Sequence, residues 1–239
     1  MKAEYITHYG SDLSAVNAAR VSMDKESEWK IVECSLATQD SDTWFEKHLD
    51  AKDEKLIGFL AKNKHFSCFE HQGATLRLKV PLFVRSQIHR HRTFSYNEIS
   101  RRYVKDNLEF YWPDKWRKAA ENVKQGSSDD AAEYMYSGGN EMWDNVDEYI
   151  RDEVLSQVLI MYKSMVDNGV CAEQARMILP QNLYTSFYMT GNLRNWAHFL
   201  KLRLDPHAQK EVRDIAKMCA AIIEPLFPVS YKALISATE

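Results

Sequence analysis

The chain has 239 residues, with 31 basic and 34 acidic side chains, so its formal net charge is −3. A composition of 45% apolar and 27% charged residues is typical of a globular protein and excludes a disordered or collagen-like chain. Eight glycines and six prolines are few for this length, which argues against a turn-rich all-β fold. The longest apolar run, Met218 to Ile223, is too short to span a bilayer, and residues 1–8 contain no apolar signal core. We therefore expect a cytoplasmic protein with no membrane partner, and the small net charge gives no argument for a nucleic-acid partner.

The cysteines are widely separated and form no C-x-x-C pair; they are Cys34, Cys68, Cys171 and Cys219. This spacing predicts neither a disulfide framework nor a cysteine-based zinc site. We expect each cysteine to be a small buried apolar residue.

The hydrophobic pattern predicts mostly helices with a few separated strands. Helical spacing occurs from the cap-type Asp12 to Val21, around 56–61, at 82–88, at 150–165, before Pro180, after Asn192 and after Asp205-Pro206, where Asp205 is expected as the N-cap. Alternation at 74–80 and the aromatic-rich segment 183–190 predict strands. The predicted fold is one α+β domain over 1–239, with a small, mostly antiparallel sheet flanked by several helices.

The sequence makes a further structural prediction for each of two segments. The helix capped by Asn192 should bury an inner stripe of Leu193, Trp196, Ala197, Leu200 and Leu204. The segment 105–148 is the least regular, with loop signals at 125–130 and 137–140, and is predicted to be a variable surface excursion of the domain.

The densest polar cluster lies at 89–102, which contains four arginines, one glutamate and no lysine. Four guanidinium groups this close repel one another unless an anion lies among them. Serine, asparagine, tyrosine and histidine are interspersed, and these side chains can bind a base or a ribose while arginine binds phosphate. The cluster therefore favours an anionic nucleotide ligand over a solvated basic surface.

Other chemistries lack their usual motifs. The eight glycines form neither G-x-G-x-x-G nor a P-loop, so side chains must hold any nucleotide. There is no G-x-S-x-G elbow for a serine hydrolase. His65, His71, His89 and His91 lack the spacing of a zinc site, so we expect no metal. Two alternatives stay open: a non-catalytic nucleotide- or RNA-binding module using the Arg/aromatic cluster, and a metal-dependent nucleotide hydrolase.

Arg90-His91-Arg92 followed after seven residues by Ser100 matches the R-H-R-x7-S signature, and the chain thereby resembles the flavin-dependent thymidylate synthases. Further blocks in the family's order are 12–22, 65–71, 175–180, 182–185 and 192–209, so the resemblance covers roughly 10–105 and 150–229. It implies a homotetramer with active sites between subunits, each holding FAD. NADPH reduces the flavin, methylenetetrahydrofolate supplies the carbon, and dUMP becomes dTMP without a cysteine nucleophile.

The resemblance also implies roles for individual residues. Arg203 matches the arginine that ionises N3 of the pyrimidine and is the one catalytic candidate. The FAD-binding candidates are Ser67, Arg90, His91, Arg92, Glu98, Asn192, Leu193, Arg194 and His198. The dUMP-binding candidates are Gln87, Ile88, His89, Arg90, Glu98, Ile99, Ser100, Arg101, Arg102, Arg176 and Arg203. Two positions depart from the family pattern, Arg101 where relatives often have glycine and Cys68 in place of a common proline.

Overall fold

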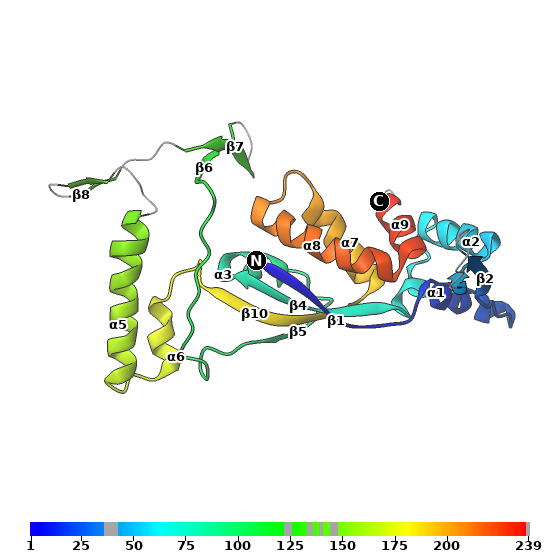
Figure 1. The fold of residues 1–239 in the computed structure, drawn as a ribbon, viewed down its shortest axis with the longest axis horizontal. Helices are drawn as coiled ribbons and strands as arrows, with labels where there is room; N and C mark the ends of the chain where they lie inside the picture. The colour runs from blue at the N-terminus through cyan, green and yellow to red at the C-terminus, as the bar shows by residue number, and fades with distance from the viewer. Residues whose placement is uncertain (36–42, 122–125, 133–135, 139–140, 144–147, 238–239) are drawn as a thin grey trace.

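The centre of the molecule is a four-stranded antiparallel sheet with the strand order β1-β4-β10-β5 (Figure 1). The computed structural model describes residues 1–35, 43–121, 126–132, 136–138, 141–143 and 148–237. The strands are β1 (Lys2–Tyr9), β4 (Gly73–Pro81), β10 (Tyr184–Asn192) and β5 (Ser95–Glu98). Strands far apart in the sequence thus lie side by side, and their connections carry the helices.

The sheet is buried on one face. In β4 the predicted alternation is confirmed, because Ala74, Leu76, Leu78 and Val80 are all buried. The register pairs Leu78 with Phe187 of β10, which is also buried. Tyr188, on the opposite face of β10, is 43% exposed. The sheet therefore packs on a single helical layer, as period-two patterning requires.

The helical layer consists of α7 (Leu193–Leu204), α8 (Lys210–Leu226) and α9 (Pro228–Ser236), and Figure 1 shows α7 and α8 along one side of the sheet. Trp196 of α7 is fully buried, and its indole N–H donates to the carbonyl of Ala74 at 3.0 Å. The predicted cap is confirmed, since the Asn192 side chain accepts from the N–H of Asn195 at 2.9 Å. The helix α3 (Leu82–Ile88) follows β4 directly.

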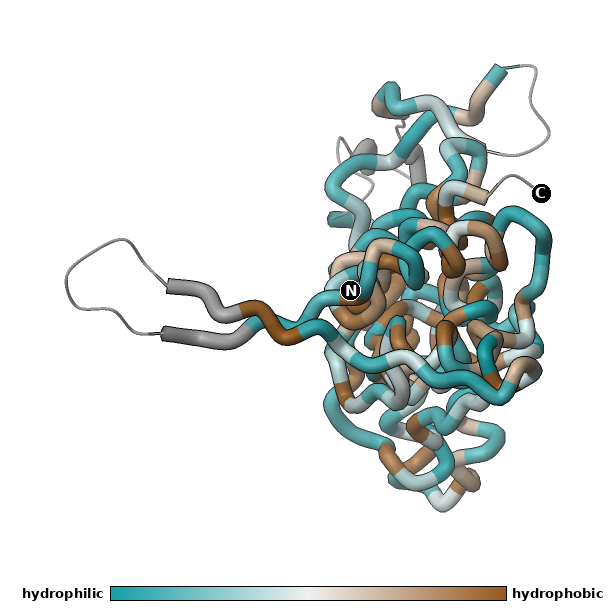
Figure 2. The backbone as a smooth tube through the Cα atoms, turned by 90° about the vertical axis from the view of Figure 1, so that its right-hand side faces the viewer, coloured by the Kyte–Doolittle hydropathy of each residue, from teal (hydrophilic) through white to brown (hydrophobic). Residues whose placement is uncertain are grey.

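Smaller units flank this core. On one side lie α1 (Asp12–Arg20), α2 (Ala51–Lys62) and the 3₁₀ segments η1 (Val21–Met23) and η2 (Phe66–Glu70). On the other lie the π-helical η3 (Tyr149–Leu155), α5 (Ser156–Asp167), α6 (Ala172–Ala175) and η4 (Arg176–Ile178), which form a second small core around Tyr162 and Leu183. The strands β2 (Lys30–Ser35) and β3 (Thr43–His48) pair as an arm that projects from the body (Figure 2). No helix in the described ranges has the length and apolar character needed to cross a bilayer.

Two predicted helix starts are wrong. Ser11, not Asp12, is the N-cap of α1, and the Asp12 carboxylate accepts hydrogen bonds from the N–H groups of Val229 and Ser230 at 2.9 and 2.8 Å. Asp12 therefore caps α9, which no local pattern could indicate. Asp205 does not cap α8 either, because its carboxylate accepts from the N–H of His207 at 2.7 Å and closes a turn before the helix.

The excursion and the cysteines also differ in part from expectation. Strand β7 (Ser127–Ala131) pairs with β6 (Arg117–Ala119), and β8 (Tyr136–Gly138) pairs with β9 (Glu141–Trp143), where only loops were expected. Residues 122–125, 133–135, 139–140 and 144–147, like the side chain of Cys34, fall outside the described residues. Cys68 and Cys219 are buried as predicted, but Cys171 is exposed. Strands β1 and β5 had not been predicted, because neither shows a clean alternation of apolar residues.

Candidate active site

The structure brings three of the predicted residues together where α3 ends. The Nε–H of Arg203, in the last turn of α7, donates to Nε2 of His91 at 2.9 Å. Its Nη2 donates to the main-chain carbonyl of Gln87 at 3.2 Å. The Nη1 group of Arg203 makes no hydrogen bond within the described part of the chain, so two of its N–H bonds stay available to a ligand.

This contact fixes the protonation state of His91. A ring nitrogen that accepts a hydrogen bond carries no proton, so the proton of a neutral imidazole is on Nδ1. Burial, together with the neighbouring Arg203 and His198, lowers the pKa of His91 to about 4. Burial also lowers the pKa of Arg203, although a guanidinium keeps its charge in proteins. In this hydrogen bond the charged guanidinium of Arg203 is the donor and the neutral imidazole of His91 is the acceptor.

Tyr96 holds the loop that carries His91 in place through hydrogen bonds to main-chain carbonyls. The Tyr96 hydroxyl donates to the carbonyls of His91 at 2.9 Å and Ile88 at 3.2 Å, and burial raises its pKa to about 12. Tyr96 is therefore a donor at any physiological pH. Arg90 and Arg92, which flank His91, are exposed, and their side chains make no hydrogen bond or ion pair with a described residue.

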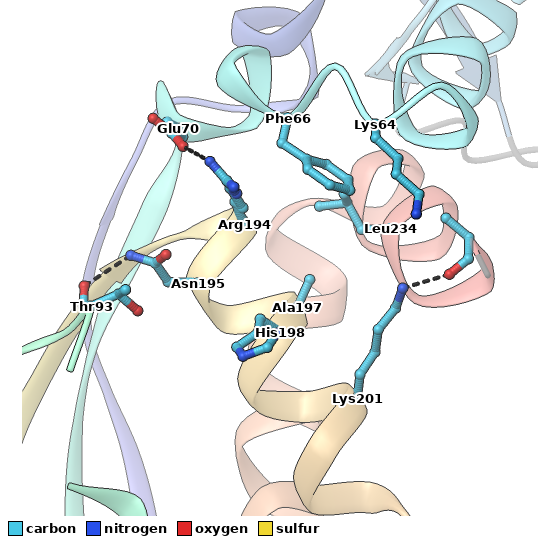
Figure 3. Close-up of a pocket in the computed structure, with 11 residues that line it drawn as sticks. Lys64, Phe66, Glu70, Thr93, Arg194, Asn195, Ala197, His198, Lys201 and Leu234 are labelled. Atoms are coloured by element: carbon cyan, nitrogen blue, oxygen red, sulfur yellow. Dashed lines mark hydrogen bonds and ion pairs between the residues drawn. The ribbon is translucent and has the colours of Figure 1, made fainter. Parts of the chain in front are cut away.

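A cavity of about 630 Å³ opens beside α7, and Figure 3 shows its lining side chains. Arg194 and His198 point into it from α7, one turn apart, while Leu193, Trp196 and Leu200 of the predicted stripe face the core and Ala197, which is 4% exposed, lies at the cavity wall. Leu204, expected in that stripe, is only partly buried. The predicted inner stripe is thus confirmed for four of its five residues.

The cavity combines cations with an aromatic ring. Arg194 lies over the Phe66 ring at 5.2 Å and donates to Glu70 Oε1 at 2.6 Å. Lys64 and Lys201 also line the cavity, and Lys201 belongs to α7 (Figure 3). The Nζ of Lys201 donates to the carbonyl of Ala237 at 2.5 Å. Such a lining suits a ligand with a planar ring system and negative charge.

Several predicted binding residues are placed where their side chains cannot line this cavity. Ile88 and Leu193 are fully buried in the core, so only their main chains could touch a ligand. The His89 ring packs against Tyr96 and Phe187 at centroid distances of 4.1 and 4.9 Å, and burial and the nearby Arg85 lower its pKa. Three other predicted binding residues also do not line this cavity. They are Ser67, which is exposed in η2, Asn192, whose side chain caps α7, and Ile99, which is 36% exposed.

Glu98, at the end of β5, is held by side chains from α3 and β10. Arg85 donates to its Oε2 from Nε at 2.9 Å and from Nη2 at 2.5 Å, and the Thr185 hydroxyl donates to its Oε1 at 2.7 Å. Both carboxylate oxygens are thus engaged. Glu98 serves here as an anchor for the strand and for Arg85.

The loop after β5 meets α6, and this brings two more predicted arginines together. Arg102 donates to the Glu173 carboxylate at 3.3 Å, and Arg176 Nε donates to the Glu173 carbonyl at 3.3 Å. Arg101 donates to the carbonyls of Asp106 and Tyr184, each at 3.2 Å, so it leans onto the sheet end. The Ser100 hydroxyl accepts from the N–H of Arg102 at 3.3 Å. In one copy of the chain this arginine group does not line the cavity at α7.

Gln87 and Glu211 belong to a second polar group. Gln87 Nε2 donates to Gln209 Oε1, and Gln209 Nε2 donates to Glu211 Oε2 at 2.8 Å. Arg117, from the excursion, donates to both oxygens of Glu211 at 2.8 and 3.1 Å. Arg117 and Glu211 also line a smaller cavity of about 410 Å³ with Tyr111, Trp112 and Trp116 among its walls.

Residues missed from the sequence lie next to the predicted ones. Phe66 and Glu70 fall within the 65–71 block, and Thr93 and Tyr96 fall within the arginine cluster, so those patterns had marked the neighbourhood. Gln209 ends the 192–209 block, whereas Glu211 and Arg117 lie outside the blocks and carried no local signal because their contact joins residues 94 positions apart. No group of three or more His, Cys, Asp or Glu side chains suited to a metal lies in the described ranges.

Comparisons with known proteins agree with this arrangement. The family model described as thymidylate synthase complementing protein matches residues 4–229. The flavin-dependent thymidylate synthase of Thermotoga neapolitana is 35% identical over 232 residues, which is 97% of this chain and 89% of that protein. The corresponding protein of Thermus thermophilus is 38% identical over 182 residues, 76% of this chain, and the match spans only 63% of the Thermus protein.

A solved structure shares the fold. The UMP/dUMP methylase PolB from Streptomyces cacaoi, bound with 5-Br dUMP, superposes with a TM-score of 0.72 at 28% identity, covering 99% of this chain and 95% of that one. The sequence match and the structural match both run through the sheet, the arginine cluster and α7. The chain therefore belongs to the thymidylate synthase complementing protein family, the family of the flavin-dependent thymidylate synthases.

Proposed function

We propose that this protein is a flavin-dependent thymidylate synthase, an FAD-dependent methyltransferase that converts dUMP to dTMP. Methylenetetrahydrofolate is the carbon donor and NADPH is the reductant in this proposal. The observation that carries it is the Arg203–His91 hydrogen bond beside the cavity lined by Arg194 and His198, in a chain that the family model matches over 4–229.

Arg203 is the proposed catalytic residue. Its Nε and Nη2 are bound to His91 and Gln87, which fixes the guanidinium plane and leaves Nη1 for the substrate. Donors from Nη1 to N3 and O4 of the uracil would stabilise the negative charge that develops when C5 becomes the nucleophile. Because the guanidinium is already oriented and partly desolvated, little reorganisation is needed during the reaction.

The cavity beside α7 fits the cofactor in chemical terms. Its cations Lys64, Arg194 and Lys201 suit a diphosphate, and the Phe66 ring suits contact with a flat ring system. We propose that Arg194, His198, Asn192, Ser67 and the main chain of Leu193 hold FAD, together with Arg90, His91, Arg92 and Glu98. When bound, FAD supplies the hydride that completes the methyl group. The protein's own contribution is to bind, orient and exclude water.

The dUMP site would combine residues from more than one copy of the chain. Arg102 and Arg176, with Ser100 and Arg101 nearby, form a cationic group suited to a phosphate, yet in one chain they do not line the α7 cavity. A homotetramer with active sites between subunits would unite them with Gln87, Arg90 and Arg203. Exposed apolar side chains on α5, such as Ile160 at 64% and Met161 at 57%, support burial against another copy.

The test begins with colour. The purified protein, as isolated or after addition of FAD, should be yellow, and its flavin absorbance should bleach when NADPH is added without oxygen. Addition of methylenetetrahydrofolate and dUMP should restore the absorbance and yield dTMP, which chromatography detects. Colourless protein that neither takes up FAD nor bleaches would contradict the proposal and favour a nucleotide- or RNA-binding module. Because the Streptomyces cacaoi protein is a methylase of UMP as well as dUMP, both nucleotides should be compared.

A further inference from the structure

The guanidinium of Arg203 takes its orientation from one turn of the chain. Its two acceptors, the main-chain carbonyl of Gln87 and Nε2 of His91, lie four residues apart, in the last turn of α3 and just beyond the helix. The turn between them is closed by the N–H of His91, which donates to the carbonyl of Ile88 at 3.0 Å. A change in the shape of this turn would therefore move both acceptors relative to α7, and the guanidinium plane with them.

The hydroxyl of Tyr96 spans the same turn. It donates to the carbonyl of His91 at 2.9 Å and shares its proton with the carbonyl of Ile88 at 3.2 Å. The first carbonyl belongs to the residue whose ring accepts from Arg203, and the second directly follows the carbonyl that binds the Arg203 Nη2 group. In the described part of the chain, no other side chain donates to these two carbonyls. Tyr96 is thus the side chain that ties the main chain of this turn together.

The sheet and its neighbours hold Tyr96 itself in place. In β5 it pairs with Met189 of β10, and its ring packs on the ring of His89 at a centroid distance of 4.1 Å. The Phe187 ring meets it edge-on at 5.9 Å. Because burial raises the pKa of Tyr96 to about 12, the hydroxyl keeps the proton that it donates. The turn that orients Arg203 is therefore fixed by a group that belongs to the rigid sheet.

We propose that Tyr96 is a positioning residue for Arg203: its hydroxyl holds the turn at 87–91, and the turn holds the guanidinium in the orientation that stabilises negative charge on the uracil ring. This inference rests on the proposed function. Tyr96 does not line the cavity beside α7, and its hydroxyl is engaged by the two carbonyls, so it acts through Arg203 and not on a ligand. A guanidinium free to rotate would lose part of its preorganisation for the transition state, while the binding of dUMP and FAD would change little.

The first measurement uses Tyr96→Phe, which removes the hydroxyl and keeps the ring that packs on His89. In the FAD-loaded enzyme we expect kcat for dTMP formation to fall about tenfold, the scale of one hydrogen bond. The KM for dUMP and the Kd for FAD should stay within about twofold of the wild-type values, because no ligand contact is removed. The matched control is Tyr188→Phe, which changes an exposed tyrosine on the neighbouring strand β10 and should keep the wild-type kcat.

A double-mutant cycle separates this role from a purely structural one. Arg203→Lys keeps a cation but has neither the guanidinium plane nor the Nε–H that binds His91, so the turn can no longer orient the charge. Tyr96→Phe should therefore lower kcat about tenfold in the wild type but by less than about twofold in Arg203→Lys. An equal loss in both backgrounds would show that Tyr96 acts independently of Arg203 and would overturn the proposal.

Other results would also overturn the positioning role. One is an unchanged kcat in Tyr96→Phe, whether or not KM and Kd rise. Another is a Tyr96→Phe protein that loses FAD or melts more than about 10 °C below the wild type, because the hydroxyl would then support the fold as a whole. A wild type that takes up FAD but makes no dTMP would overturn the proposed function, and the role of Tyr96 with it.

Discussion

Arg203 points its Nε–H at Nε2 of His91 across 2.9 Å, and the imidazole is 7% exposed. A proton on Nε2 would put two donors and two positive charges face to face, with His198 close by at a ring distance of 6.0 Å. The folded protein consequently accommodates His91 in its neutral form. Lowering the pH therefore favours the unfolded state, in which His91 can take up a proton without facing Arg203.

Stability should therefore fall in mild acid. The pKa of His91 is about 4 in the folded protein and about 6.5 in an unfolded chain, so between these values the unfolded state binds more protons. The free energy of unfolding should decrease by about 2–3 kcal/mol from pH 6.5 to pH 4 through this residue. Urea titrations at pH 7 and pH 5 should show a smaller decrease for His91→Gln, which keeps an acceptor but cannot ionise. Equal decreases in both proteins would contradict this account.

Replacement of Arg203 should separate catalysis from cofactor binding. Arg203→Ala removes the donors proposed for N3 and O4, so the rate of dTMP formation should fall by about 10²- to 10³-fold or more. The flavin absorbance should remain, because Arg203 does not line the cavity at Arg194. Lys217→Ala, an exposed cation on α8, is the matched control. Wild-type turnover in Arg203→Ala would exclude the catalytic role.

Arg194 and Glu70 should affect the cofactor unequally. Arg194→Ala removes a cation and its contact over Phe66, so the Kd for FAD should rise by about tenfold. Glu70→Gln keeps the shape but weakens the 2.6 Å ion pair, and because the pair is half-exposed the effect on FAD should be small. Flavin fluorescence titration measures both constants. A larger loss in Glu70→Gln than in Arg194→Ala would show that the pair, and not the cation, matters.

Asp12 should stabilise the fold more than its position near the amino terminus suggests. Its carboxylate is 3% exposed and accepts two N–H groups at the start of α9, so Asp12→Ala leaves both donors buried without a partner. We expect a loss of about 2–3 kcal/mol in the free energy of unfolding. Asp12→Asn keeps one acceptor and should lose less. Chemical denaturation of the two variants gives the order, and an unchanged Asp12→Ala would refute it.

Gly191 should not tolerate a side chain. A Cβ at this position would lie 2.5 Å from two ring carbons of Phe94, which is buried against Trp196 and Phe199. Gly191→Ala should cost about 1–3 kcal/mol and disturb the loop that carries His91. Gly58→Ala in α2 meets no atom within 4 Å and should be neutral or stabilising. Thermal unfolding of both variants makes the comparison, and equal melting temperatures would count against the packing argument.

The sequence anticipated the elements whose signals are local. The alternation at 74–80 and the cap at Asn192 each depend on residues a few positions apart, and both predictions are confirmed. Strand β1 was missed because it is an edge strand whose side chains are mostly exposed, so it carries no apolar period. The misplaced start of α8 shows the same limit, since Asp205 can close a turn with His207 as readily as cap a helix.

The site residues that could be predicted are those in the sequence blocks that carry the family resemblance. The arginine cluster and α7 did converge, through His91 and Arg203. Burial was not predictable residue by residue, so Ile88 and His89 were named for binding although their side chains pack inward. The pairing of Glu211 with Arg117 could not be predicted, because a hydrogen bond between residues 94 positions apart leaves no period in a sequence.

Helix α7 sets the distance between the two ends of the proposed reaction site. Arg194 and Arg203 are nine residues apart, so a straight helix separates them by about 13.5 Å along its axis. Inserting or deleting one residue between them would shift one end by about 1.5 Å and turn it by about 100° relative to the other. Related chains should therefore vary in length in segments such as 105–148, while the interval from Arg194 to Arg203 stays constant.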